Sequence, residues 1–351
     1  MRYDTIWWEQ IGSSLRLLGG IADVFRDCVS TVLVRPAVMP WPEYFTESVQ
    51  HRRAVFSAER RLIRLPWRSG RDPGDTVLKE LCPERVRAAY WPGQSCGTYL
   101  GSQEDLVLNS CDIWVTGIHD SCDLLRWADF VRQYDRAAEK AEKRAVFLLD
   151  YDGPPVANCG LPVLHYIIES HDCRVFCQET VAAQKKSGFG EYRAELALQV
   201  GGRDPELCCA LLQTGSMLEE DPVAAAAAVT AEHLTSDGRR FPALSEQQVL
   251  SAAWRSGVVL LFPVLEQWRL DFISRYEKTL ASYLPISNSM GEKVTDPFDL
   301  EIGALHYLAG QHKIAFDPTD IEKIALCRRA RNQLAHNKMI SCDDAQRIRA
   351  L

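Results

Sequence analysis

The chain of 351 residues lacks a long uninterrupted hydrophobic run. Its most apolar stretch, residues 257–265, contains Pro263 and is about half as long as the roughly 18 residues that a membrane-spanning helix needs. Residues 1–8 also lack the apolar block and small-residue cleavage site of an export signal. We therefore expect a cytoplasmic protein with no membrane segment.

The chain also lacks an excess of positive charge, since its formal net charge is −7. A negative total gives no general reason to expect a nucleic-acid partner. Residues 321–351 differ, because they carry seven Lys and Arg against three Asp and Glu, a local net charge of +4. This segment is the one electrostatic indication of a polyanionic partner such as RNA.

The twelve cysteines do not form the pattern of a disulfide-rich secreted domain, because they are scattered along a long chain. The densest group of potential metal ligands is His165, His171, Cys173 and Cys177. Its spacing matches no closed zinc pattern, and residues 173–181 alternate as in a strand. We predict buried free thiols and no metal site.

Strand and helix patterns alternate in the first half of the chain. The expected strands cover residues 31–34, 60–65, 112–118, 145–150 and 174–181. The expected helices cover residues 7–26, 42–56 and 124–143. Such alternation predicts crossover units, and hence an α/β domain with a mainly parallel sheet covered by helices on both faces.

Helical patterns dominate the second half. They cover residues 191–200, 205–212, 224–228, 245–283, 299–308 and 318–336. We therefore predict an α/β domain over residues 1–200, a helical connector over residues 201–244, and an all-α domain over residues 245–351.

The first half resembles the P-loop NTPases, in particular the STAND and AAA+ branch, in its strand, turn and helix followed later by an apolar strand ending in Asp150. In that fold the first strand leads into a glycine-rich loop whose amides hold phosphates. Residues 35–43 contain no Gly, no Lys and three Pro. Because each proline removes a backbone donor, this loop is expected not to bind phosphate. We predict no nucleotide cofactor and no NTP hydrolysis.

Asp150 has two interpretations. The resemblance implies a surviving magnesium ligand, whereas a simpler interpretation is a strand-end acid that caps a turn with Asp152 and Gly153. Without a phosphate loop we favour the second. Residues 41–45 and 112–117 look like segments of inactive STAND-like proteins, which are associated with prokaryotic conflict and phage-defence systems. That likeness implies a binding or transmission module.

One group of residues near the C-terminus suggests a catalytic site. The segment from Arg331 through Asn332 to His336, with Ala335 before the histidine, resembles the Arg and His signature of HEPN domains. The resemblance implies a metal-independent ribonuclease with Arg331, Asn332 and His336 as catalytic residues. The chemistry fits, since a histidine can take the 2′-hydroxyl proton while a cation stabilises charge on the phosphate.

Helix geometry limits this interpretation. Five residues are about 500° of helical rotation, which leaves Arg331 and His336 about 140° apart. Either the helix ends at His336 with Asn337 in the left-handed conformation, or two copies share the site. We accordingly expect a homodimer or a complex with a protein partner. In the structural alternative, Arg331 pairs with an acid such as Asp299 or Glu301, and His336 caps the helix.

These observations predict a cytoplasmic component of a prokaryotic defence system. Its first half would be a sensor or adaptor without NTPase activity, and its HEPN-like half would cleave or bind RNA. The alternative function is a scaffold without catalysis that bridges an ATPase partner to a separate effector.

Overall fold

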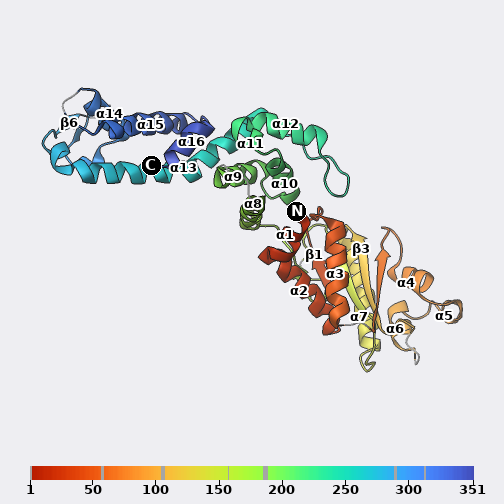
Figure 1. Ribbon diagram of the computed structural model, residues 1–351. Coiled ribbons are helices and arrows are strands. Elements are labelled where there is room, and N and C mark those ends of the chain that lie inside the picture. Colours follow the sequence, from red (N-terminus) through yellow and green to blue (C-terminus); the bar gives the residue numbers. More distant parts are fainter. Residues whose placement is uncertain are drawn as a thin grey trace. The chain divides into compact units, whose positions relative to one another are not determined.

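A computed structural model describes residues 2–56, 59–103, 107–156, 158–184, 189–287, 291–311 and 314–351. The chain forms two compact units, Met1–Asp172 and Cys173–Leu351 (Figure 1). The first unit contains a sheet with helices, and the described part of the second is largely helical.

A five-stranded parallel sheet organises the first unit, in the order β2-β3-β4-β1-β5. Its strands are β1 (Thr31–Val34), β2 (Arg61–Pro66), β3 (Cys111–Ile118), β4 (Val146–Tyr151) and β5 (Val163–His165). The first four strands confirm the predictions to within about one residue. The short β5, which has exposed residues, was not predicted.

Both faces of the sheet are covered, which confirms the predicted α/β architecture. Trp114 of β3 pairs with Leu148 of β4. Because side chains alternate between faces along a strand, Trp114 and Phe147 point to opposite sides of the sheet. The Trp114 ring contacts Phe45 in an edge-on arrangement at 5.6 Å, whereas Phe147 contacts Phe130 and Tyr134. Phe45 lies in the helix between β1 and β2, whereas Phe130 and Tyr134 lie in the helix between β3 and β4. Different helices therefore cover the two faces of the sheet.

The helices of the first unit are α1 (Tyr3–Gln10), α2 (Gly12–Arg26), α3 (Pro42–Phe56), α4 (Pro73–Leu81), α5 (Glu84–Ala89), α6 (Cys96–Gly101) and α7 (Ser121–Ala137). The single helix predicted over residues 7–26 is two helices, because Ile11 adopts an extended backbone conformation between them. The short helices α4, α5 and α6 have too few turns to produce a clear periodic pattern and were not predicted.

The strand predicted over residues 174–181 is wrong, because this segment belongs to helix α8 (Ser170–Gln184). Cys173, Phe176, Cys177 and Thr180 are buried, and their spacing of three and four residues is that of one helix face. Arg174 of α8 forms an ion pair with Glu195 of α9 (Gly190–Gly201). The boundary between the units therefore lies at residue 172 rather than near residue 200, and residues 201–244 belong to the second unit.

The other elements of the second unit are α10 (Pro205–Gln213), α11 (Met217–Glu220), α12 (Pro222–Glu232), α13 (Glu246–Ala281), β6 (Ile286–Ser287), β7 (Lys293–Val294), η1 (Pro297–Asp299), α14 (Ile302–Gly310), α15 (Pro318–Ala335) and α16 (Cys342–Arg349). Helices α10, α12, α13, α14 and α15 lie close to predicted helices, whereas α11, η1, α16 and the two short strands were not predicted. Strands β6 and β7 form a small antiparallel pair.

Helix α13 provides much of the core of this unit. Its side chains Leu265, Trp268 and Phe272 are buried at helical spacing and form one hydrophobic cluster with residues of α14, α15 and α16. By length and composition, α13 is the one helix in the described part of the chain that could cross a membrane. In its most apolar window, 39% of the residues are buried inside the unit.

Candidate functional site

The carboxyl edge of the sheet has the topology of a ligand-binding site. Strands β1 and β4 are neighbours, but the chain leaves β1 toward β2 at one edge of the sheet and leaves β4 toward β5 at the other. Connections that part in this way create the crevice where open α/β sheets bind ligands. Arg35 follows β1, and Asp150 lies near the end of β4.

These two residues neutralise each other. Arg35 Nε donates to Asp150 Oδ1 at 2.5 Å, and Trp114 Nε1 donates to Asp150 Oδ2 at 3.2 Å. The side chains of Arg35 and Asp150 are only 13% and 4% exposed. Burial raises the pKa of Asp150, although Arg35 and Trp114 act in the opposite direction. A magnesium ion would have to displace the guanidinium of Arg35 to reach this carboxylate.

A backbone carbonyl of the loop after β1 also binds Arg35. Arg35 Nη1 donates to the carbonyl of Pro36 at 2.8 Å, so this part of the loop presents an acceptor to a cation rather than amides to a phosphate. The interpretation of Asp150 as the cap of a turn is wrong, because its oxygens bind Arg35 and Trp114. Asp152 Oδ1 lies 2.5 Å from His119 Nδ1, and Asp152 Oδ2 forms a longer ion pair with Arg35 Nη1 at 3.6 Å.

The four potential metal ligands His165, His171, Cys173 and Cys177 do not form one site. Cys173 and Cys177 are buried, whereas the His171 side chain is 69% exposed. Within the residues that the structure describes, no group of three or more His, Cys, Asp or Glu side chains is arranged to hold a metal ion.

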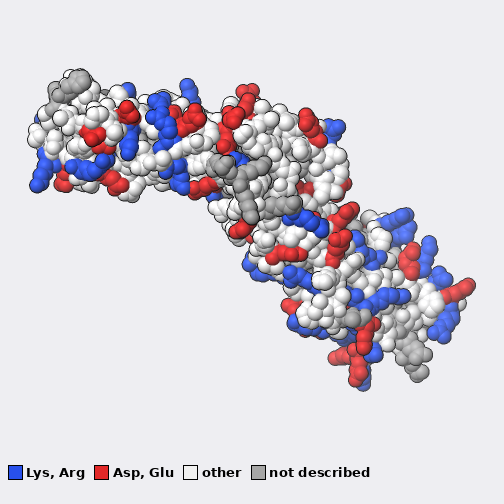
Figure 2. Space-filling model, in the orientation of Figure 1, with Lys and Arg blue, Asp and Glu red and all other residues white. Residues whose placement is uncertain are grey.

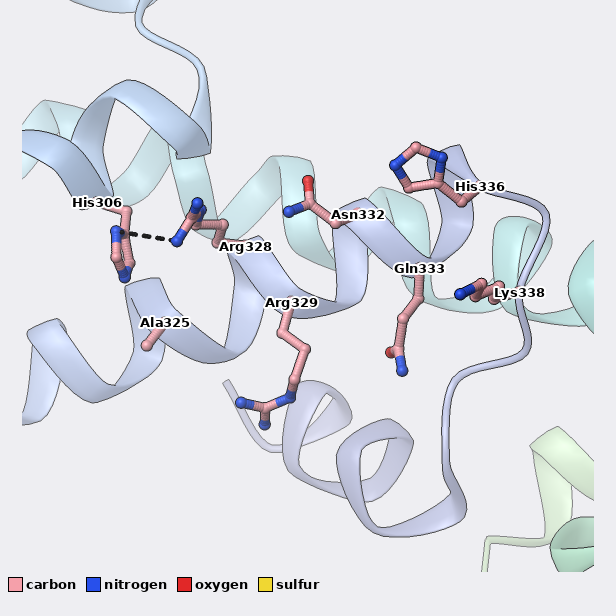
Figure 3. A pocket seen from close by; sticks show the side chains of 8 residues that line it. All are labelled: His306, Ala325, Arg328, Arg329, Asn332, Gln333, His336 and Lys338. Atoms are coloured by element: carbon pink, nitrogen blue, oxygen red, sulfur yellow. Dashed lines mark hydrogen bonds between the residues drawn. The ribbon is translucent and has the colours of Figure 1, made fainter.

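The second unit contains a cavity of about 500 Å³ on the surface of α15 (Figure 3). Its lining residues are His306, Ala325, Arg328, Arg329, Asn332, Gln333, His336 and Lys338. Arg328, Asn332 and His336 are four residues apart and therefore follow one another along one helix face. Figure 3 shows these three side chains in a row, with His306 of α14 beside Arg328.

The end of α15 confirms the predicted cap. His336 is the C-terminal capping residue, and Asn337 has a φ of 55°. The N–H of Lys338 donates to the carbonyl of Gln333 at 2.9 Å, and that of Asn337 donates to Leu334 at 3.2 Å. This pair of bonds is a Schellman motif. The turn returns Lys338 to the cavity.

The structure brings together two of the three predicted catalytic residues. Asn332 and His336 line the cavity, whereas Arg331 is not among its lining residues. Arg331 Nη2 lies 3.4 Å from Glu301 Oε2, which is the pairing that the structural alternative predicted. The cation on the face of His336 is Arg328. Sequence reasoning missed it, although its spacing of eight residues from His336 was a usable signal.

His306 is the second missed residue. Arg328 Nη1 lies 3.4 Å from His306 Nδ1, which accepts the hydrogen bond if the imidazole is neutral. Partial burial, and then the charge of Arg328, lower the pKa of His306 below its ordinary value.

The cavity is suited to an anion because no carboxylate lines it. Asp344 neutralises Arg329 through two hydrogen bonds at 3.0 and 2.8 Å. Arg328 and Lys338 have no carboxylate partner within the described residues, so their charges remain available to a ligand. Elsewhere on the visible surface, charges of both signs are interspersed (Figure 2).

The row is long enough for more than one phosphate group. Arg328 and His336 are eight residues apart, which corresponds to about 12 Å along the helix axis. The site can therefore present a guanidinium, an amide and an imidazole to a polyanion in sequence. No protein-family model matches the chain, and no curated protein matches it in sequence.

Proposed function

We propose that the second unit binds single-stranded RNA in the α15 cavity and cleaves it without a metal ion. One observation carries this proposal: Arg328, Asn332 and His336 share one helix face in a cavity without a carboxylate. Phosphate groups are recognised by such cationic and amide donors. An imidazole at the end of the row adds a group that can transfer a proton near neutral pH.

The proposed reaction is transesterification within the RNA. His336 takes the proton of a 2′-hydroxyl, whose oxygen forms a bond to the adjacent phosphorus while the bond to the 5′ oxygen breaks. The proton then passes to the departing 5′ oxygen, so the products are a 2′,3′-cyclic phosphate and a 5′-hydroxyl. Asn332 donates a hydrogen bond to a phosphate oxygen, and Arg328 stabilises the negative charge of the bound strand.

For the first unit we propose a sensor or adaptor role without NTP hydrolysis, in a cytoplasmic prokaryotic defence system. The neutralised Arg35–Asp150 pair supports the absence of hydrolysis, because it fills the crevice between β1 and β4 with an internal ion pair. The HEPN-like and STAND-like resemblances of the sequence support the defence context. A protein partner would then supply the signal.

Assembly is no longer required by the geometry of α15. The expected homodimer depended on Arg331, which does not line the cavity with His336 and pairs with Glu301. Because Arg328 shares the face of His336, about 12 Å along the helix, one copy can bind the strand with Arg328 and carry His336. We therefore propose that partner binding or dimerisation regulates the site rather than completing it.

The test uses the full chain with its partner and a single-stranded RNA, with a chelator present throughout. We expect wild type to produce 2′,3′-cyclic phosphate ends, and His336→Ala to lose about 10² to 10⁴-fold in rate. His336 is exposed at a helix end, so its truncation opens no core cavity. An inert wild type, or a variant that only melts at a lower temperature, would contradict the ribonuclease.

A scaffold without catalysis is the second candidate, and the ion pair between Arg331 and Glu301 favours it. In that case the residue that the motif marks has a structural role. RNA binding without cleavage, or partner binding that is unchanged in His336→Ala, would support the scaffold.

A further inference from the structure

A second cavity, of about 590 Å³, lies beside the C-terminal turn of α15. It is lined by Ser245, Glu246, Gln247, Leu250, Ser251, Trp254 and Asn337. His336 lines the first cavity and Asn337 lines this one, so consecutive residues border the two cavities. The inference drawn from this cavity rests on the proposed RNA function.

Four lining residues share one face of α13. Gln247, Leu250, Ser251 and Trp254 are spaced by three, four and seven positions, as neighbours on a helix surface are. Trp254 Nε1 donates to the carbonyl of Leu334 at 2.8 Å. This bond ties the indole to the last turn of α15 and so holds the second cavity in register with His336.

The cavity combines an apolar wall with unused amides. Leu250 is 42% exposed, and Trp254 is half-buried, so both present apolar surface. Within the described part of the chain, the side-chain amides of Gln247 and Asn337 form no hydrogen bond or ion pair. Unpaired bases in RNA are recognised by apolar or aromatic surfaces together with hydrogen bonds to their edges.

The charges of the two cavities differ. Glu246 lines the second cavity and disfavours a phosphate there, whereas no carboxylate lines the first. A nucleotide at the end of α15 would therefore place its phosphate near His336 and its base near Asn337.

We propose that the second cavity is a nucleobase subsite that selects the residue next to the bound phosphate. A side-chain amide offers one donor and one acceptor, which match N7 and N6 of adenine. The subsite therefore prefers an unpaired adenine, with Gln247 as the residue that determines the preference.

The experiment measures binding of the full chain to labelled oligouridylate with one central adenosine, and to oligouridylate of the same length with uridine at that place. Gln247→Ala is compared with wild type, and Gln267→Ala is the matched control, since Gln267 lies on α13 outside both cavities. We expect wild type to prefer the adenosine RNA on the order of tenfold. Gln247→Ala should lose this preference, and Gln267→Ala should keep it.

The outcomes separate the two proposals. Equal binding of the two RNAs by wild type, or an undiminished preference in Gln247→Ala, would overturn the subsite and leave the RNA site in place. Binding of neither RNA would overturn both.

Discussion

The two units contain similar chemical groups at the places where a ligand would bind, but the groups are used differently. At the carboxyl edge of the sheet, the partly buried Arg35 and the buried Asp150 bind each other. On α15 and in the turn that follows it, Arg328 and Lys338 line an open cavity without a carboxylate. A charged residue suggests a site only when the fold leaves its charge available.

The reason lies in the cost of burying charge. A buried guanidinium must be paired, and a carboxylate that pairs with it is no longer a free ligand. An exposed cation on a helix surface pays little desolvation and can exchange water for phosphate. The comparison predicts that variants of the first unit will change stability, and that variants of the cavity will change RNA chemistry.

The largest expected effect separates Arg328 from Arg331. If Arg328 holds a phosphate of the bound strand about 12 Å from His336, Arg328→Ala should lower kcat/KM for RNA cleavage, measured as the single-turnover rate below saturation, about 10- to 10²-fold. Arg331→Ala is the matched control and should lose less than about threefold, because that side chain pairs with exposed Glu301, a pairing of little energetic weight. Single-turnover cleavage rates measure both. The reverse ranking would restore Arg331 and require a second copy at the site.

The next effect concerns the stability of the first unit. Arg35→Met removes the partner of a buried carboxylate and should cost about 3 to 5 kcal/mol in the free energy of unfolding. Arg35 opposes the effect of burial on Asp150, so its removal raises the pKa of that carboxyl further. A raised pKa in the folded state means that stability is lost as pH rises through it. Denaturant unfolding should show a larger loss at pH 8 than at pH 5.

Two further variants check this pair. In Arg35→Met with Asp150→Asn, the buried charge is gone and Trp114 keeps an acceptor, so the double variant should be more stable than Arg35→Met alone. Asp27→Ala removes an exposed ion pair with Arg26 and should cause no measurable change. If the loss of stability in the double variant equals the sum of the losses in Arg35→Met and in Asp150→Asn, the two residues act independently.

A smaller effect is expected for Lys338. Removing one phosphate contact to a single strand should lower the slope of log affinity against log salt by about 0.7. Lys338→Ala should therefore weaken RNA binding most at low salt, whereas Lys278→Ala on α13, outside the cavity, should not. Anisotropy titrations across a salt series provide the slopes. Equal slopes would remove Lys338 from the site.

The smallest effect is the heat of nucleotide binding, which we expect to be undetectable. The loop after β1 lacks Gly and Lys, and its arginine occupies the carboxylate of Asp150. Calorimetry of the full chain with ATP and magnesium is the measurement. Micromolar binding that disappears in Asp150→Ala would contradict the inactive first unit and show that Arg35 moves aside.

Hydrophobic periodicity predicted secondary structure correctly where neighbouring residues alone determine the element. The strand over residues 31–34 and the helix over residues 42–56 match the structure to the residue. The segment over residues 174–181 failed, because short apolar alternation fits a buried helix face as well as a strand. Helices α4, α5 and α6 were missed because their short lengths give no clear periodicity.

The sequence by itself offered His336 as the C-terminal cap of α15, one of two alternatives, and the structure confirms it, because a left-handed Asn337 closes the helix through backbone bonds within one turn. The sequence also determined that the loop after β1, with three prolines and no glycine, forms no amide nest. Only the tertiary structure decided which charges remain available. Asp150 lies 115 residues from Arg35, and Arg331 lies 30 residues from Glu301. Ion pairs between distant segments form only when packing brings them together, and they decide which residues are left for a ligand.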